Sequence, residues 1–360
     1  MRSTKTDRKI KVLIVDDSRV SQRLYAGILA LSESFEIVAT ARNGHEAIAY
    51  TKQYHPDVIS MDINMPLMGG VEATKRIMDE NPVPILIVSS LYDNSNIELA
   101  MEVLEAGAVA IIPKPNGPGH PRFNFDAARY TRNLKRMSEV AVTRKKIKPS
   151  NQKNTQEGSK TEPKIHNGLA HSNYEVLVIG ASAGGPEATK AILSKFEADF
   201  PLPIVLVQHI DPNFTNGYKN WLQTWTKLEL NIINSQTIIL PGRVYLSPGN
   251  KHIIFSKKGI VSLSDDAPNK GHRPSVAQLF ESAAKVYSKN TMAVLLSGMG
   301  TDGAAELKTL KNLGALTIVQ DEESCLVFGM PGTAVQLNAA CTIAPPDEIV
   351  NVILKYTNPK

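Results

Sequence analysis

The chain has 360 residues, of which 42% are hydrophobic and 21% are charged, and its formal net charge is +5 at pH 7. These values are typical of a globular protein, and the length leaves room for two domains with separate cores. No apolar run approaches the roughly 18 residues of a membrane span, and the two cysteines, Cys325 and Cys341, are too few for a disulfide framework and lack metal-ligand spacing. We therefore expect a cytoplasmic protein with no secretory signal and no membrane insertion.

The positive charge is concentrated in one segment. Residues 129–164 contain 11 Lys and Arg against 3 Asp and Glu, so the rest of the chain is net negative. A charge run of this kind is typical of a solvated connector, and transient contact with an acidic surface is the alternative. The location of the charge argues against nucleic-acid binding.

The first third of the chain alternates strand-like and helix-like segments. In chain order we expect strand 11–15, helix 19–31, strand 35–39, helix 44–53, strand 57–61, helix 71–79, strand 84–89, helix 97–106 and strand 109–112. Strands that alternate with helices predict a parallel, doubly wound α/β sheet with right-handed crossovers.

The character of the chain changes after this region. Residues 126–146 keep apolar residues at roughly helical spacing, which predicts a last helix that runs on as a stalk. Residues 148–172 have almost no large apolar side chain, and such a segment cannot bury enough surface to order itself. Strand and helix alternation resumes at Tyr174. The expected organisation is a first domain at 9–126, a helical stalk and flexible basic linker at 127–172, and a second α/β domain at 173–357.

Polar side chains follow the strands of the first domain. Asp16, Asp17 and Asp62 each come at the end of a predicted strand, and Ser89 and Lys114 end two others. If these strand ends meet at one edge of the sheet, the three carboxylates lie close together. They then repel one another unless they coordinate a hard cation such as Mg²⁺. Such a site would let a carboxylate of Asp62 attack a phosphoryl donor in line. For the Asp pair or Lys114 taken alone, the alternatives are a solvated turn and a surface lysine.

Three apolar strands of the second domain also end in polar residues. They lead into Ser182, His209 and Asp302. Ligands bind outside the carboxyl ends of parallel strands, so the three side chains would meet there as a nucleophile, a general base and the carboxylate that orients the base. Each residue alone has a plainer interpretation: a tight or phosphate-binding turn for Ser182, a loop histidine for His209 and a helix cap for Asp302.

Four motifs of the first domain resemble those of response-regulator receiver domains. They are Val-Asp-Asp-Ser-Arg at 15–19, Met-Asp-Ile-Asn-Met-Pro-Leu-Met at 61–68, Ile-Val-Ser-Ser at 87–90 and Ile-Pro-Lys-Pro at 112–115. The resemblance implies a flavodoxin-like fold, phosphorylation of Asp62 by a histidine kinase, and Mg²⁺ held by Asp16, Asp17 and Asp62. It also implies that Ser89 and Lys114 switch with phosphorylation. Gly69-Gly70 departs from the pattern, because receivers commonly carry an acidic residue or Asn before the glycine.

The second domain resembles the chemotaxis protein-glutamate methylesterase and glutaminase family over nearly its whole length. The motifs are Gly-Ala-Ser-Ala-Gly-Gly-Pro, Val-Gln-His-Ile-Asp-Pro-Asn-Phe-Thr, Tyr-Leu-Ser-Pro-Gly-Asn-Lys-His, His-Arg-Pro-Ser-Val, Leu-Ser-Gly-Met-Gly-Thr-Asp-Gly and Gln-Asp-Glu-Glu-Ser-Cys-Leu-Val-Phe-Gly-Met-Pro. The resemblance implies a serine hydrolase that demethylates glutamates and deamidates glutamines on chemoreceptors, with no cofactor for the ester chemistry. It also implies that the backbone N–H of Met299 helps form an oxyanion hole. Ala183 and Gly332-Thr333 depart from the pattern, since relatives usually carry threonine at the first position and a basic residue at the second.

The same resemblance implies that the unphosphorylated receiver covers the esterase cleft and that phosphorylation relieves the block. Two other classes stay open on the sequence: a receptor-binding adaptor that has lost hydrolysis, and a phosphorylation-dependent DNA regulator. The second domain is too long for a helix-turn-helix module and has no evident basic recognition helix.

Overall fold

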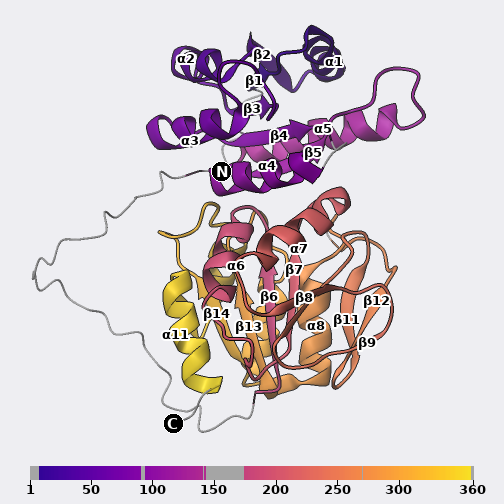
Figure 1. The fold of residues 1–360 in the computed structure, drawn as a ribbon, viewed down its shortest axis with the longest axis vertical. Coiled ribbons are helices and arrows are strands. Elements are labelled where there is room, and N and C mark those ends of the chain that lie inside the picture. The colour runs from indigo at the N-terminus through magenta and orange to yellow at the C-terminus, as the bar shows by residue number, and fades with distance from the viewer. Residues whose placement is uncertain (1–7, 91–93, 141, 143–173, 270, 358–360) are drawn as a thin grey trace, which may run out of the picture. The chain divides into compact units, whose positions relative to one another are not determined.

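The computed structural model describes residues 8–90, 94–140, 142, 174–269 and 271–357, except for the side chains of 94–98 (Figure 1). The chain divides into two compact units, Met1–Arg144 and Lys145–Lys360. The predicted flexible linker, 148–172, lies outside the described residues. No helix in the described part of the chain is long and apolar enough to span a membrane.

The N-terminal unit is a five-stranded parallel sheet with strand order β2-β1-β3-β4-β5. Its elements are β1 (Ile10–Val15), α1 (Arg19–Ala30), β2 (Phe35–Ala41), α2 (Gly44–Tyr54), β3 (Val58–Met61), α3 (Gly70–Glu80), β4 (Ile85–Ser89), α4 (Asn94–Glu105), β5 (Ala110–Pro113) and α5 (Phe123–Ser138). Helices α1 and α5 contact each other, while α2, α3 and α4 contact one another in a row. This arrangement is the flavodoxin-like, doubly wound fold, and it confirms the predicted class.

Helix α5 begins at Phe123 and ends at Ser138. It contacts β3 and β4, and Tyr130 and Leu134 on its inner face are fully buried. The hydroxyl of Tyr130 donates to Ser60 Oγ at 2.9 Å, which ties the helix to the middle of the sheet. Over its described length the helix therefore packs as a layer of the N-terminal unit rather than projecting as a stalk.

The C-terminal unit is built on a seven-stranded, wholly parallel sheet with order β15-β14-β13-β6-β7-β10-β8. The strands of this sheet are β6 (Val176–Ala181), β7 (Ile204–Gln208), β8 (Glu229–Ile232), β10 (Arg243–Leu246), β13 (Thr291–Leu295), β14 (Leu316–Gln320) and β15 (Thr342–Ala344). A small antiparallel sheet, which the sequence did not predict, is formed by β9 (Thr237–Ile238), β11 (His252–Lys257) and β12 (Ile260–Ser264).

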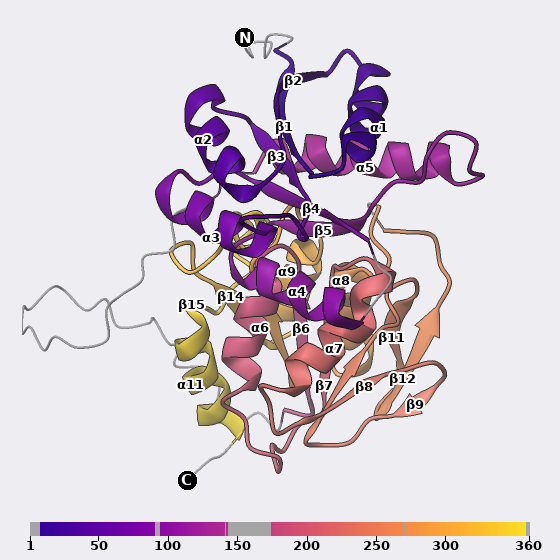
Figure 2. The same cartoon turned by 45° about the horizontal axis from the view of Figure 1, so that its top comes forward.

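Helices cover both faces of the large sheet (Figure 2). Helices α6 (Gly185–Leu193), α7 (Thr215–Gln223) and α11 (Pro346–Thr357) form one layer, and α8 (Val276–Val286), α9 (Ala304–Asn312) and α10 (Met330–Gln336) form the other. Two single 3-10 turns, η1 (Pro212–Phe214) and η2 (Ser288–Asn290), complete the unit. Strands β6, β7 and β13 are buried at every position, as expected for parallel strands packed on both faces. The second α/β domain is thus confirmed as doubly wound.

The strand order of this sheet positions the site. Strands β13, β6 and β7 are direct neighbours although they lie far apart in the sequence. All three are parallel, so their carboxyl ends meet at one edge of the sheet. The connections that carry Asp302, Ser182 and His209 therefore leave the sheet side by side.

Candidate active site and acidic site

Ser182 lies in the tight connection between β6 and α6. Its backbone N–H donates to Ser297 O at 3.0 Å, and its carbonyl accepts from Gln208 Nε2 at 2.7 Å. Gly184 adopts a φ of 75°, and a Cβ atom there would lie 2.6 Å from Leu326 Cβ and 2.7 Å from Ser297 Oγ. The turn therefore requires glycine at this position, and it holds the serine backbone through neighbours on both sides.

His209 follows β7 directly and is held next to the serine. Its backbone N–H donates to Ala181 O at 2.9 Å, so the residues after β6 and β7 are in register. Its Nε2 atom lies 2.9 Å from Asp302 Oδ2, and its side chain is 8% exposed. The buried Nδ1 atom has no hydrogen-bond partner among the described residues, so the Ser182 hydroxyl does not engage it in this conformation. Such catalytic hydrogen bonds often form only when substrate is bound.

Asp302 is held at the N-terminus of α8. Its Oδ1 atom accepts from Ser275 Oγ at 2.8 Å and from the Ala277 N–H at 3.1 Å, and its Oδ2 atom also accepts from the Val276 N–H at 2.7 Å. Burial alone would raise the pKa of this carboxyl, but the bonds to His209, Ser275 and Val276 outweigh it and lower the pKa to about 2. Asp302 is therefore ionised at neutral pH, and its four contacts fix its orientation.

The contact between His209 and Asp302 gives the two ring nitrogens of His209 different roles, one as a hydrogen-bond donor and one as a proton acceptor. An ionised carboxylate only accepts hydrogen bonds, so Nε2 must carry the ring proton. The neutral Nδ1 atom then has a lone pair and can accept a proton. This is the tautomer that a general base for serine requires.

Two residues of the site were not assigned a role from the sequence. Ser275 bonds Asp302, and the His272 ring stacks on that of His209 with centroids 4.1 Å apart and an interplanar angle of 6°. Both belong to the His-Arg-Pro-Ser-Val motif. The motif was recognised in the sequence, but it did not indicate which atoms these two side chains contact. His252 is fully buried, and its Nδ1 atom accepts from the Ser275 N–H at 3.2 Å, so it supports the segment behind the site rather than lining it.

The loop after β13 passes close to Ser182. A Cβ atom at Gly298 would lie 2.7 Å from Ser182 Cβ, so the backbone approaches the serine as closely as only glycine allows. The Gly298 carbonyl accepts from the N–H groups of Gly329 and Met330 at 3.1 and 2.8 Å. Because the carbonyl and the next N–H of a trans peptide point in opposite directions, the Met299 N–H is aimed away from α10.

The residues of the second domain that depart from the family pattern lie in the turn after β6 and in α10. Ala183 is buried, and its carbonyl accepts from Ser297 Oγ at 2.7 Å, so this position contributes backbone to the turn. Gly332 is buried in α10, and a Cβ atom there would lie 3.0 Å from the Phe328 ring. Thr333 continues the same helix.

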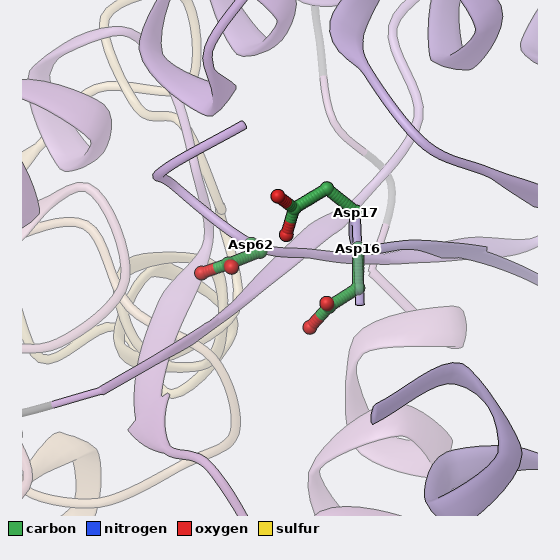
Figure 3. Close-up of side chains that lie close together, drawn as sticks. All are labelled: Asp16, Asp17 and Asp62. Atoms are coloured by element: carbon green, nitrogen blue, oxygen red, sulfur yellow. The ribbon is translucent and has the colours of Figure 1, made fainter. Parts of the chain in front are cut away.

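Three acidic side chains of the N-terminal unit lie close together (Figure 3). Carboxylate oxygens of Asp16, Asp17 and Asp62 all lie within 4.8 Å of one another, with Asp17 exposed and the other two buried. Lys114 Nζ lies 2.9 Å from Asp16 Oδ2 and 2.7 Å from Asp62 Oδ2. Ser89 is buried at the end of the neighbouring strand β4, and its hydroxyl donates to Ser90 O at 3.4 Å.

One lysine offsets part of the negative charge of this site. Burial raises the pKa of Asp62, although the bond to Lys114 and its positive charge act in the opposite direction. Burial would lower the pKa of Lys114, but its bonds to Asp62 and Asp16 outweigh this and raise it. The oxygens of the three carboxylates are donors that Mg²⁺ prefers, and the exposed Asp17 opens the cluster to solvent. The donor set therefore fits a hard divalent cation.

Gly69 and Gly70 sit where the connection after β3 enters α3. A Cβ atom at Gly70 would lie 2.4 Å from the Asp62 carbonyl oxygen, so glycine is required where the chain passes behind the acidic site. Gly69 precedes the helix and supplies no side-chain cap. The Gly44 N–H donates to Met68 O at 2.9 Å and anchors the connection to α2.

Comparisons with known proteins agree with this architecture. Residues 12–120 match the family described as response regulator receiver domain, and residues 177–353 match CheB methylesterase. A protein-glutamate methylesterase/protein-glutamine glutaminase of Geobacter metallireducens is 39% identical over 96% of this chain and 98% of its own length. One of Hahella chejuensis is 40% identical over 95% and 97%. The crystal structure of the Thermotoga maritima CheB methylesterase catalytic domain is 32% identical, covers 51% of this chain and 98% of its own, and gives a TM-score of 0.49.

The fold and the two family matches define a class of protein: a phosphorylation-regulated hydrolase in which a receiver domain precedes an α/β esterase domain. Several relatives that align with nearly the whole chain at 38–39% identity then specify the family. The chain belongs to the protein-glutamate methylesterase/protein-glutamine glutaminase family of chemotaxis, and the class predicted from the sequence is confirmed.

Proposed function

We propose that Ser182, His209 and Asp302 are the catalytic triad with which this enzyme hydrolyses glutamate γ-methyl esters and deamidates glutamines on chemoreceptors. The observation that carries the proposal is the 2.9 Å contact between His209 Nε2 and Asp302. It leaves His209 Nδ1 without a partner among the described residues, next to the connection that bears Ser182.

The chemistry follows from the proton positions. The Ser182 hydroxyl attacks the γ-carbonyl carbon, and its proton moves to His209 Nδ1 as the Oγ–C bond forms. The resulting imidazolium stays paired with ionised Asp302. When the tetrahedral intermediate collapses, the proton passes from Nδ1 to the leaving methoxide or amide, which departs as methanol or ammonia. Water then attacks the γ-glutamyl ester of Ser182 with the same base, which releases glutamate and restores the serine.

The oxyanion of each tetrahedral intermediate needs hydrogen-bond donors. We assign the Met299 N–H to this role, because the peptide before it is anchored through the Gly298 carbonyl and runs beside Ser182. A donor fixed in advance costs no reorganisation when the charge develops, and removing one such donor typically costs about 3 to 4 kcal/mol of activation free energy. The ester chemistry requires no cofactor in this scheme.

In the receiver we assign Asp62 as the phosphoacceptor, with Mg²⁺ held by Asp16, Asp17 and Asp62. When bound, the ion neutralises the phosphoryl oxygens during transfer. Lys114 supplies a compact positive charge at 2.7 Å from Asp62, and Ser89 supplies a hydroxyl at the end of the adjacent strand. Phosphorylation adds acceptor oxygens and negative charge at Asp62, which would draw in both groups and repack the receiver.

The partners follow from these sites. A histidine kinase would phosphorylate the receiver, and methyl-accepting chemoreceptors would be the protein substrates, so that the enzyme resets sensory signalling. We propose a cytoplasmic location, with neither nucleic acid nor membrane insertion involved. We propose that the receiver runs from residue 9 to the end of α5, because this helix packs in the N-terminal unit as far as Ser138 and the predicted boundary at 126 falls inside it. The division of the chain near Arg144 supports a boundary beyond α5, and the catalytic domain is proposed at 173–357.

The decisive experiment measures methanol release from a methylated chemoreceptor, with and without a phosphodonor, for wild type and Ser182→Ala. We expect wild-type release to rise with phosphodonor and the variant to lose about 10⁶-fold in kcat, as when a triad acts as one unit. Wild-type-like release by Ser182→Ala would refute the nucleophile. No release by the wild-type protein under either condition would favour a receptor adaptor.

A further inference from the structure

The histidine proposed as general base has a second histidine lying flat against it. The rings of His209 and His272 are 4.1 Å apart between centroids and only 6° from parallel. His272 comes from the segment between β12 and α8, whereas His209 follows β7, so the contact joins two separate parts of the domain. It is distinct from the Asp302 bond, which meets the edge of the His209 ring.

The position of His272 is set by its own backbone. Its N–H donates to Asn269 O at 2.9 Å, and its carbonyl accepts from the Asn269 N–H at 3.0 Å, which makes an isolated antiparallel bridge. On one side, His252 Nε2 contacts Ala267 O at 3.3 Å; on the other, the Ser275 N–H donates to His252 Nδ1. Two backbone hydrogen bonds therefore hold His272 to Asn269, and the ring stack joins this part of the chain to His209.

The bond to Asp302 alone does not fix the base. Rotation about the Cβ–Cγ bond of histidine is soft, because this torsion joins sp³ and sp² atoms and has broad minima. A ring held at Nε2 can tilt about that bond, and the tilt moves Nδ1 out of the plane in which it accepts the serine proton. A parallel ring against one face blocks the tilt in that direction.

We propose that His272 is a positioning residue, whose flat ring holds His209 in the plane that joins Asp302 to Ser182. The inference rests on the triad proposed above and adds a part to it. A flat aromatic side chain at position 272 covers this face of the His209 ring, and an aliphatic one does not.

The test compares His272→Ala, His272→Leu and His272→Phe in the full-length, phosphodonor-activated enzyme. We expect kcat for methanol release to fall about 10- to 100-fold in the Ala and Leu variants, the size expected when a reacting group is misplaced by about 1 Å. KM should stay close to the wild-type value, because the ring acts through His209. His272→Phe should restore most of kcat. The rate at which Ser182 reacts with a small fluorophosphonate probe should change in parallel.

Arg273→Ala is the matched control for the segment. Arg273 Nη1 contacts Asp265 O and Asp266 O at 3.3 and 3.4 Å, so its loss loosens the same segment without removing the stack. Melting temperatures verify that each variant is folded, and the downfield proton resonance of His209 Nε2 reports the ring itself. It should broaden in the Ala and Leu variants and stay sharp in Phe and in Arg273→Ala.

Wild-type kcat in both the Ala and Leu variants would overturn the proposal. So would a Phe variant as slow as Ala, or a loss expressed in KM, since these point to hydrogen bonding or substrate contact. If Ser182→Ala keeps its activity, the triad fails instead, and the two failures are therefore distinguishable.

Discussion

Asp302→Asn tests the site most directly, because every contact of the carboxylate is a donor. Oδ2 accepts from His209 and the Val276 N–H, and Oδ1 accepts from Ser275 and the Ala277 N–H. An amide has one acceptor oxygen and one NH₂ group. In either orientation its NH₂ faces a backbone N–H of α8, which leaves a buried donor unsatisfied at about 1 to 3 kcal/mol.

The lowered pKa of Asp302 expresses the effect of the same contacts as a dependence of stability on pH. The pKa is lowered from its ordinary value of 3.8 to about 2 in the folded protein, which corresponds to about 2 kcal/mol of stability for the ionised form. Because the folded pKa is the lower one, this stability is present above about pH 4 and is lost as the pH falls toward 2.

We therefore expect the thermal transition of the catalytic domain in Asp302→Asn to fall by about 4 to 8 °C at neutral pH. The difference from wild type should shrink as the pH falls from 4 to 2. Catalysis should fall further, by about 10⁴-fold in kcat, since an amide NH₂ toward Nε2 would put the ring proton on Nδ1 and disable the base. Calorimetry and methanol release measure the two effects. An unchanged transition with kcat within about tenfold of wild type would refute the assigned contacts.

Three further predictions concern the same assignments. Ser275→Ala removes one donor to Asp302 but leaves the contact with His209, so it should cost about 1 kcal/mol of stability and far less activity than Asp302→Asn; equal losses in methanol release would contradict this. Asp62→Asn should keep low basal esterase activity that acetyl phosphate cannot raise, and stimulation of this variant would count against phosphorylation there. Removal of residues 1–172 should raise basal methanol release, and a well-folded fragment with an unchanged or lower rate would argue against inhibition by the receiver.

Much of the fold could be predicted from local patterns. The strands that precede Asp16, Asp62 and Ser182 are mostly apolar and are followed by a polar residue at the carboxyl end, and such runs are typical of buried parallel strands. Some boundaries shifted because helix ends depend on caps and packing; α5, predicted at 126–146, begins at Phe123 and ends at Ser138. The antiparallel sheet β9-β12-β11 was missed because its strands are only partly buried and β9 has only two residues.

For the candidate sites, too, some residues could be predicted from local patterns and others could not. Strand ends identified Ser182, His209 and Asp302, and they also identified the carboxylates that meet within 4.8 Å around Asp62. Ser275 and His272 stood in a recognised motif, yet nothing in their spacing indicated which atom they would contact. A hydrogen bond through space and a ring stack leave no periodic signal in a sequence.

Residue types, the order of strands and helices along the chain, and the family resemblance could all be predicted before folding is considered, because each depends on residues that are neighbours in the chain. Tertiary structure alone decided that β13, β6 and β7 lie side by side. It also decided that the start of α8 faces Asp302 and that a second imidazole covers His209. These contacts join segments that are tens of residues apart in the chain. Their geometry is fixed only when the helices pack on both faces of the sheet and the buried donors find their acceptors.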